Sequence, residues 1–376
     1  MSPLRILQLN SARKYIGEAA HTLNLTEALR RSGHSVWLGL RKNFDTIERA
    51  AARGLDPIGF FMPHRWWPPQ DGRDIHRIAR LIRDHKIDII HAHRGKDHWQ
   101  AVLATRLSGA RVPVIRTRHV VTPLSANPAN RWLARRTATL VCVSKAVEND
   151  VRGTGIYGDR LAFIPGGVDL DLFKPPDQAA RNAARKSLGL DAQARVAVCV
   201  ARFARVKAHR VLLAAWKKVS EKIPLARLVL VGDGQLFDES RELAGQLGIA
   251  ERVIFLGRRN DVPGILDAAD AGVLSSVGSE GFSRAVLEYM TKGLPTVATR
   301  VGAVPDLIED GVQGMVVEPE NADALAAALE KVLSADAAQI GHWSKAAREK
   351  AERGHGYEHW ASAHEKLYRA VLEKKT

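Results

Sequence analysis

Two glutamates separated by seven residues carry the most specific chemical signal in the sequence. Glu280 lies in the run Ser279–Ser283, in front of a stretch that we predict to be a helix with Ser283 as its N-cap, and Glu288 lies inside that helix. A loop carboxylate and a helix carboxylate that converge on one ligand can hold adjacent hydroxyl groups of a ribose or a hexose. The alternative for Glu288 is a charge on a solvated helix face, although its apolar neighbours leave that helix few polar sides.

Two cations and a helix start could bind phosphate in the same half of the chain. Arg202 and Lys207 follow an apolar run, and two cations in a loop between a strand and a helix can clamp a diphosphate. The backbone amides of Gly281, Phe282 and Ser283 would form a second anion site at a helix N-terminus. The alternative for Arg202 and Lys207 is a pair of solvated surface charges.

Two glycines that follow another apolar run do not form the dinucleotide-binding motif of nicotinamide-dependent enzymes. Gly232 and Gly234 directly follow an apolar run, but the full G-x-G-x-x-G pattern is absent, and no acidic residue is placed to bind a ribose. This argues against a nicotinamide-dependent dehydrogenase.

Histidines gather at two predicted strand ends in the first half. His119 could hydrogen-bond a sugar hydroxyl or act on a leaving group, although a histidine in this position is often structural. His91 and His93, two residues apart on a strand, would point the same way and could begin a metal site. No third ligand with matching spacing appears, so we predict no metal site.

The elements that position these groups follow one repeating pattern. Short apolar runs alternate with amphipathic stretches between residues 4 and 164, and the alternation restarts at Arg195 and continues to Val317. Such a pattern predicts an α/β chain with two tandem doubly wound, Rossmann-like domains, whose ligands bind in a cleft beyond the carboxyl ends of the strands. We expect domains at residues 1–168 and 169–355, with a C-terminal helix in 356–376 that packs back on the first domain.

Composition excludes several classes of protein. The 376 residues are 45% hydrophobic and 26% charged, which is typical of a globular chain and excludes a disordered one. The two cysteines, Cys142 and Cys199, lie inside apolar runs, so we expect core residues and no disulfide scaffold or cysteine zinc site. With no signal peptide and no apolar run of about 18 residues, we expect a cytoplasmic protein.

The net charge of +15 is distributed unevenly along the chain. Residues 1–170 contain 27 Lys and Arg against 14 Asp and Glu, whereas residues 171–376 contain 29 against 27. The basic first half indicates an anionic partner, either a membrane surface, a nucleic acid or a charged substrate. Trp66 and Trp67, with basic neighbours, could lie at a lipid interface or in the core, and both alternatives stay open. No nucleic-acid-binding module is recognisable.

Taken together, these segments resemble the retaining nucleotide-sugar glycosyltransferases of family 4, which have the two-domain GT-B fold. The resemblance covers nearly the whole chain, and each piece alone is weak. The matching pieces, in family order, are His91–His93, His119, Val143–Lys145, Ile164–Asp169, Arg202 with Lys207, Val231–Gly234, Val253–Gly257, Glu280 with Glu288, Gly302–Pro305, Glu309–Gly311 and Gly314.

The resemblance implies a role for each matching residue. Arg202 and Lys207 would bind the donor diphosphate, Glu288 the ribose hydroxyls, and Glu280 hydroxyls of the transferred sugar, assisted by the amides of Gly281, Phe282 and Ser283. His119 would contact the sugar near its anomeric centre, and Gly17 would approach the donor phosphate from the other domain. The family's first loop usually carries paired glycines, whereas this chain has a single Gly17.

The implied reaction is front-face substitution with retention, with no cofactor, no metal and no protein nucleophile, in a site that domain closure shields from water. We expect the acceptor to be a lipid-linked intermediate, a lipopolysaccharide or another cell-envelope glycan, and the enzyme to lie peripherally on the inner face of the cytoplasmic membrane. The alternatives are a GT-B enzyme of another outcome (epimerisation, phosphorolysis, sugar-phosphate or small-molecule glycoside synthesis) and, from a different class, a non-catalytic basic protein that binds nucleic acid.

Overall fold

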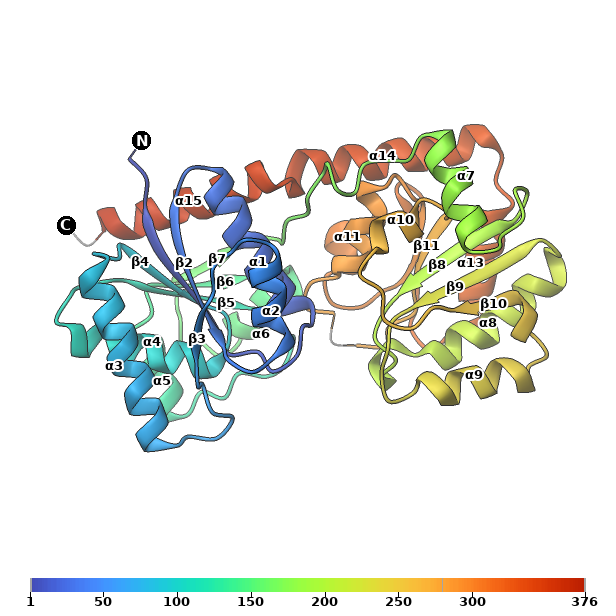
Figure 1. Ribbon diagram of the computed structural model, residues 1–376. Helices are drawn as coiled ribbons and strands as arrows, with labels where there is room; N and C mark the ends of the chain where they lie inside the picture. Colours follow the sequence, from blue (N-terminus) through green and yellow to red (C-terminus); the bar gives the residue numbers. More distant parts are fainter. Residues whose placement is uncertain (1, 279, 375–376) are drawn as a thin grey trace. The chain divides into compact units, whose positions relative to one another are not determined.

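Alternating apolar and amphipathic segments fold into strands and helices in the computed structural model, which describes residues 2–278 and 280–374 (Figure 1). The chain forms two compact units. Unit 1 comprises Met1–Gly167 with Tyr357–Thr376, and unit 2 comprises Val168–Gly356. Ser279, which the sequence places beside Glu280, and the last two residues of the predicted region 356–376 lie outside the described residues.

Unit 1 contains a parallel sheet of seven strands in the order β3-β2-β1-β4-β5-β6-β7. The strands are β1 (Arg5–Asn10), β2 (Ser35–Arg41), β3 (Ile58–Phe60), β4 (Ile89–Ala92), β5 (Val114–Arg118), β6 (Thr139–Cys142) and β7 (Leu161–Phe163). The helices are α1 (Gly17–Arg31), α2 (Asp45–Ala52), α3 (Pro68–Asp84), α4 (Gly95–Ser108), α5 (Pro128–Ala134), α6 (Lys145–Arg152) and α15 (Tyr357–Glu373). Because side chains alternate across a strand, Ile6 of β1 packs with α1 and α15, while Leu7 and Leu9 pack with α3 and α4.

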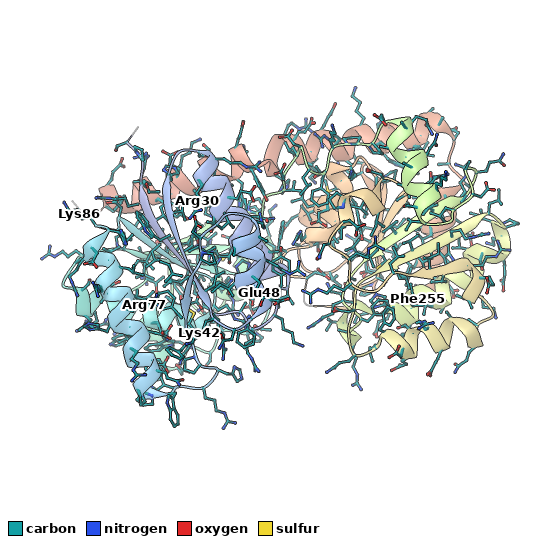
Figure 2. The ribbon with its side chains drawn as sticks, in the orientation of Figure 1. Arg30, Lys42, Glu48, Arg77, Lys86 and Phe255 are labelled. Atoms are coloured by element: carbon teal, nitrogen blue, oxygen red, sulfur yellow. The ribbon has the colours of Figure 1, made fainter. Side chains whose placement is uncertain are left out.

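Unit 2 contains a parallel sheet of six strands in the order β10-β9-β8-β11-β12-β13. The strands are β8 (Arg195–Val200), β9 (Ala226–Val231), β10 (Val253–Phe255), β11 (Ala271–Leu274), β12 (Thr296–Thr299) and β13 (Gly314–Val317). The helices are α7 (Gln178–Ser187), η1 (Arg205–Lys207), α8 (His209–Lys222), α9 (Phe237–Gln246), η2 (Ala250–Arg252), α10 (Val262–Leu266), α11 (Arg284–Thr291), α12 (Val304–Leu307), α13 (Ala322–Leu333) and α14 (Ala337–His355). Phe255, labelled in Figure 2, packs edge-on against Phe237 with ring centroids 5.8 Å apart on one face of this sheet.

These two sheets confirm the predicted α/β class with two Rossmann-like domains. In both units the strand order reverses at one point, between β1 and β4 in unit 1 and between β8 and β11 in unit 2, which is where doubly wound sheets bind ligands. Cys142 and Cys199 are free and buried in the cores, as expected. No helix within residues 2–278 and 280–374 has the length and apolar character needed to cross a membrane.

Two further details of the fold are the edge strand β3 and the break between the last two helices. The three-residue edge strand β3 was not predicted, because its single buried residue, Phe60, gives too short a signal. Helix α14 ends at His355 and α15 begins at Tyr357, with an extended backbone at Gly356 between them. There the amide of Val168 donates to the carbonyl of His355, and a Cβ on Gly356 would crowd the Leu170 side chain, so the break suits glycine.

Candidate functional site

The strongest candidate site lies in unit 2, at the point where the strand order reverses. The loop after β8 carries Arg202 and ends in η1 with Lys207, and the loop after β11 carries Glu280. A main-chain hydrogen bond of 2.9 Å from Val277 to Val206 joins the two loops, and the Ser275 hydroxyl donates to the Lys207 carbonyl at 2.9 Å. The tertiary structure thus brings together charged residues 73 positions apart in sequence.

The Glu280 carboxylate is nearly fully buried and is held by three polar side chains. Lys207 forms an ion pair with its Oε1, and the Ser276 hydroxyl donates to the same oxygen at 2.6 Å. The Ser283 hydroxyl donates to the other oxygen, Oε2, at 3.2 Å. A buried carboxylate needs such partners to remain charged, and together they fix its orientation.

Ser283 therefore differs from its predicted role as a side-chain cap. It does stand at the N-cap position of α11, but its hydroxyl makes no capping hydrogen bond and reaches Glu280 instead. The helix start leaves its first amides without this side-chain acceptor, since the hydroxyl is used on the carboxylate.

The Glu280 backbone is fixed from the opposite side by the loop after β12. The Ala303 amide donates to the Glu280 carbonyl at 2.8 Å, and Gly302 has a φ of +52°. A Cβ on Gly302 would overlap the Glu280 carbonyl, so only glycine permits this approach. Gly302 was noted in the sequence only as a family match, and the contact gives it a physical reason.

The Arg202 loop is shaped by the two glycines of the Gly232–Gly234 turn. Gly232 and Gly234 have φ values of +147° and +149°, and a Cβ on them would overlap the carbonyls of Ala201 and Phe203 respectively. The Phe203 amide also donates to the Asp233 carbonyl at 2.8 Å. The turn thus positions the backbone on both sides of the exposed Arg202.

Glu288 is buried on α11, which excludes the solvated helix face that the sequence left open. Its Oε1 accepts a hydrogen bond of 2.6 Å from Nε of Arg284, one turn earlier on the same helix. The next residue, Tyr289, anchors the helix, because its hydroxyl accepts from the Val200 amide at the end of β8 at 2.6 Å.

Unit 1 has a second polar cluster at the carboxyl ends of its central strands. His93 directly follows β4, His119 directly follows β5, and Gly17 begins α1 at an exposed position. Nδ1 of His93 lies 3.2 Å from Nε2 of His119, and Nε2 of His93 lies 2.6 Å from Oε1 of Gln8. His91 instead faces the core, between the hydroxyls of Tyr368 and Thr117 at 2.7 Å each.

Burial keeps these histidines uncharged. The pKa of His119 is lowered to about 3, first by desolvation and then by the charges of Arg116 and Arg94. Desolvation also lowers the pKa of His93 well below its ordinary value. Near neutral pH, His119 is therefore a neutral hydrogen-bonding group that supplies no positive charge.

The sequence missed one histidine of this cluster. His21 of α1 offers a third ring nitrogen, and the ligand atoms of His21, His93 and His119 lie within 4.8 Å of one another. Its position in the middle of an amphipathic helix gave no signal, because only the packing of α1 on the sheet places it beside the strand ends. Ser276, which donates a hydrogen bond to Glu280 from four residues earlier in the same loop, was also missed.

The exposed tryptophans lie at the same edge of the unit 1 sheet. Trp66 and Trp67 are 52% and 57% exposed in the loop between β3 and α3, which excludes a core position for both side chains. Trp132 of α5 instead stacks on Trp99 with ring centroids 5.4 Å apart, and the Arg136 guanidinium lies over the Trp132 ring.

Comparisons with known proteins identify the kind of enzyme. Residues 180–350 match the family described as glycosyl transferases group 1, and residues 17–172 match glycosyltransferase family 4. The chain is 30% identical over 278 residues, 70% of each protein, to the UDP-Gal:alpha-D-GlcNAc-diphosphoundecaprenol alpha-1,3-galactosyltransferase of Escherichia coli.

Two solved structures share the fold across nearly the full length. A glycosyltransferase from Rickettsia africae superposes with a TM-score of 0.88 at 20% identity, covering 99% of both chains. Anabaena HepE in complex with UDP and glucose superposes with a TM-score of 0.85 at 21% identity, covering 98% of this chain and all of that one.

Proposed function

Because this chain belongs to the family 4 glycosyltransferases, which have the GT-B fold, we propose that it transfers a glycosyl group from a nucleotide diphosphate sugar to the hydroxyl group of an acceptor. The observation that carries the proposal is the Lys207–Glu280 pair at the strand-order reversal of unit 2. A cation and an oriented carboxylate at this point suit a phosphate beside a sugar hydroxyl.

In the donor site, Lys207 and the exposed Arg202 bind the diphosphate, and Glu280 accepts hydrogen bonds from hydroxyls of the transferred sugar. The amides of Gly281, Phe282 and Ser283 assist, and Glu288 binds the ribose hydroxyls. In unit 1, neutral His119 contacts the sugar near its anomeric carbon, and Gly17 leaves space for the donor phosphate because no atom would crowd a Cβ there. The structure of Anabaena HepE is a complex with UDP and glucose, which supports testing UDP-sugars first as donors.

The reaction proceeds with retention and without a metal. The bond from the anomeric carbon to the diphosphate breaks, and the acceptor oxygen bonds to the same face while its proton passes to the departing diphosphate. Glu280 is held by Lys207, Ser276 and Ser283, which supports a binding role for it rather than that of a nucleophile. Arg202 and Lys207 stabilise the negative charge that develops on the leaving group.

The acceptor is a lipid-linked or cell-envelope glycan, reached at an anionic membrane surface. The loop of residues 61–67 supports this proposal, because it presents Trp66 and Trp67 to solvent at the edge of the sheet that also bears His93 and His119. The loop is held in place: the Trp67 amide donates to Asp71 at 2.7 Å, and Lys96 pairs with Asp71 while its ammonium lies 4.3 Å from the Trp66 ring centroid. Exposed tryptophans beside cations suit a lipid interface. The Escherichia coli relative, by its name, acts on a diphosphoundecaprenol-linked sugar.

A two-stage experiment tests the proposal. A thermal-shift screen of the purified chain against UDP-, GDP- and ADP-sugars identifies the donor, because a ligand of the folded state raises Tm. Transfer is then measured with that donor after EDTA treatment, against lipid-linked GlcNAc and small hydroxyl acceptors such as L-malate, and NMR determines the anomeric configuration of the product. Retained configuration and full activity after EDTA are expected, whereas an inverted product or a strict metal requirement would overturn the mechanism. Turnover of small acceptors alone would overturn the acceptor class.

A further inference from the structure

Three histidines from separate elements of unit 1 meet at the point where its strand order reverses. His21 comes from α1, His93 follows β4 and His119 follows β5, and one nitrogen from each lies within 4.8 Å of the other two. The closest pair, Nδ1 of His93 and Nε2 of His119, is 3.2 Å apart. Ligands around a tetrahedral zinc ion with bonds of about 2.0–2.1 Å lie about 3.3 Å from one another, which is close to the separation of this pair. In this structure these two nitrogens are hydrogen-bonded to each other, so an ion must replace that hydrogen bond.

The ring of His93 is also oriented by a hydrogen bond to its second nitrogen. Oε1 of Gln8 accepts a hydrogen bond from Nε2 of His93 at 2.6 Å, which places the proton of the neutral ring on Nε2. The lone pair of His93 then lies on Nδ1, directed towards His119. An oxygen acceptor behind a histidine is the usual outer-shell arrangement in metal sites, since it fixes both the tautomer and the ring orientation.

Each neutral ring has one nitrogen without a proton, and this nitrogen is the atom that can bind a metal ion. Binding through Nε2 of His119 requires only that its proton move to Nδ1. His119 is partly exposed, which leaves a side of the cluster open to a fourth ligand from solvent.

The surrounding charges select the kind of ion. The positive charges of Arg94 and Arg116 act on His119 and disfavour any cation, although Arg94 is ion-paired with Glu18 of α1. The cluster has three imidazoles and no carboxylate ligand. Such a donor set disfavours Mg²⁺ and Ca²⁺, which prefer oxygen, and suits Zn²⁺, Co²⁺ or Ni²⁺.

We propose that His21, His93 and His119 form a binding site for one divalent transition-metal ion, with Zn²⁺ as its preferred occupant. Binding requires the ligand nitrogens, which lie within 4.8 Å of one another, to approach further. A consequence rests on the proposed function: because His119 is assigned to the transferred sugar, the ion competes with the sugar and inhibits transfer.

Metal binding is tested without reference to activity, on the tag-free full-length chain after EDTA treatment. Titration with Co²⁺, followed by visible absorption, should give the intense bands of a four-coordinate ion at one equivalent per chain, and Zn²⁺ should abolish them. The His21→Asn and His119→Asn variants should bind Zn²⁺ at least about tenfold more weakly by calorimetry. His359→Asn, an exposed histidine on α15, is the matched control and should bind as the wild type does.

The results separate the two proposals. Absence of Co²⁺ bands and of calorimetric heat in the wild-type chain, which needs no variant to fold, would overturn the metal site and leave the transferase assignment untouched. The metal site would also be overturned if the His21→Asn variant, shown to be folded by circular dichroism, bound Zn²⁺ with the same affinity as the wild type. In transfer assays, Zn²⁺ should inhibit the wild type and excess EDTA should reverse the inhibition; Zn²⁺ binding without inhibition would retain the metal site and remove His119 from the sugar site.

Discussion

The ammonium group of Lys207 donates a hydrogen bond to Oε1 of Glu280, so the cation proposed for the donor diphosphate and the carboxylate proposed for the transferred sugar neutralise each other. The pair links the loops after β8 and β11, and its groups are fixed further by Ser276 and Ser283. In the proposed donor complex, the donor replaces or shares this ion pair, so changes to either partner should affect transfer more than folding.

Replacing Glu280 by Gln or Lys207 by Ala should lower kcat for transfer by about 100-fold or more, because each change removes an oriented charge from the reacting region. Steady-state kinetics of each purified variant, with its fold checked by circular dichroism, measures the effect. Lys218→Ala is the matched control, since this lysine forms an exposed ion pair with Asp323 on the same unit and should retain full activity. Unchanged transfer by both site variants would remove this pair from the donor site.

Glu288→Gln should raise the KM for the nucleotide sugar by about 10- to 100-fold with a smaller change in kcat, because hydrogen bonds to a charged group contribute about 1.5–3 kcal/mol. A truncated donor that lacks the ribose should bind the wild type and the variant equally. Glu330→Gln, which removes a surface partner of Lys222, serves as the control. A large fall in kcat at unchanged KM would contradict the ribose role.

Gly232→Ala should destabilise unit 2, because the residue has a φ of +147° and the new Cβ would overlap the Ala201 carbonyl. A backbone conflict of about 1–3 kcal/mol corresponds to a fall in Tm of roughly 2–12 °C for a domain of this size. Gly245→Ala lies in helix α9 with open space around it and should leave Tm unchanged or raise it slightly. Differential scanning calorimetry compares the two, and equal Tm values would show that the turn relaxes without cost.

Replacing both Trp66 and Trp67 by Ser should weaken binding to vesicles that contain anionic lipid, because it removes exposed aromatic area beside basic residues. Co-sedimentation at low and high salt measures the change, and salt should weaken the remaining charge-driven binding. Leu172→Ser, at an equally exposed apolar residue of unit 2, is the control. If wild-type protein fails to sediment with these vesicles at low salt, the membrane proposal is wrong.

Stability should fall as the pH decreases from about 6.5 towards 4. Desolvation lowers the pKa of His364 and of His209 to about 4, below the value of 6.5 expected after unfolding, so the unfolded chain binds more protons in this window. Each such histidine removes up to about 1.4 kcal/mol of stability per pH unit. Buried Asp97 opposes this trend, because burial raises its pKa.

Tm measured between pH 7.5 and 4.5 tests this dependence. His209→Gln should reduce the slope relative to wild type, whereas His342→Gln, at an exposed position in the same unit, should not. A Tm that stays constant across the window would show that the buried histidines are solvated or paired before unfolding.

The repeating pattern of apolar runs was sufficient to predict two parallel α/β domains. Strand and helix periods are local properties of the sequence, and a buried parallel sheet needs apolar residues on both faces, so the signal is strong in runs such as Arg195–Val200. It fails at β3, where three residues give too little periodicity.

The residue types of the candidate site were also evident from the sequence, but their contacts were not. Motif spacing singled out Glu280, Lys207 and His119 as chemical groups, because loop residues that follow apolar runs lie at the carboxyl edge of a parallel sheet. Only the tertiary structure paired Lys207 with Glu280 across 73 residues and turned the Ser283 hydroxyl from a helix cap to a carboxylate partner. It also brought His21 from α1 to the histidines at two strand ends, because packing of a helix on a sheet decides which side chains share a space, and no spacing within one segment records that.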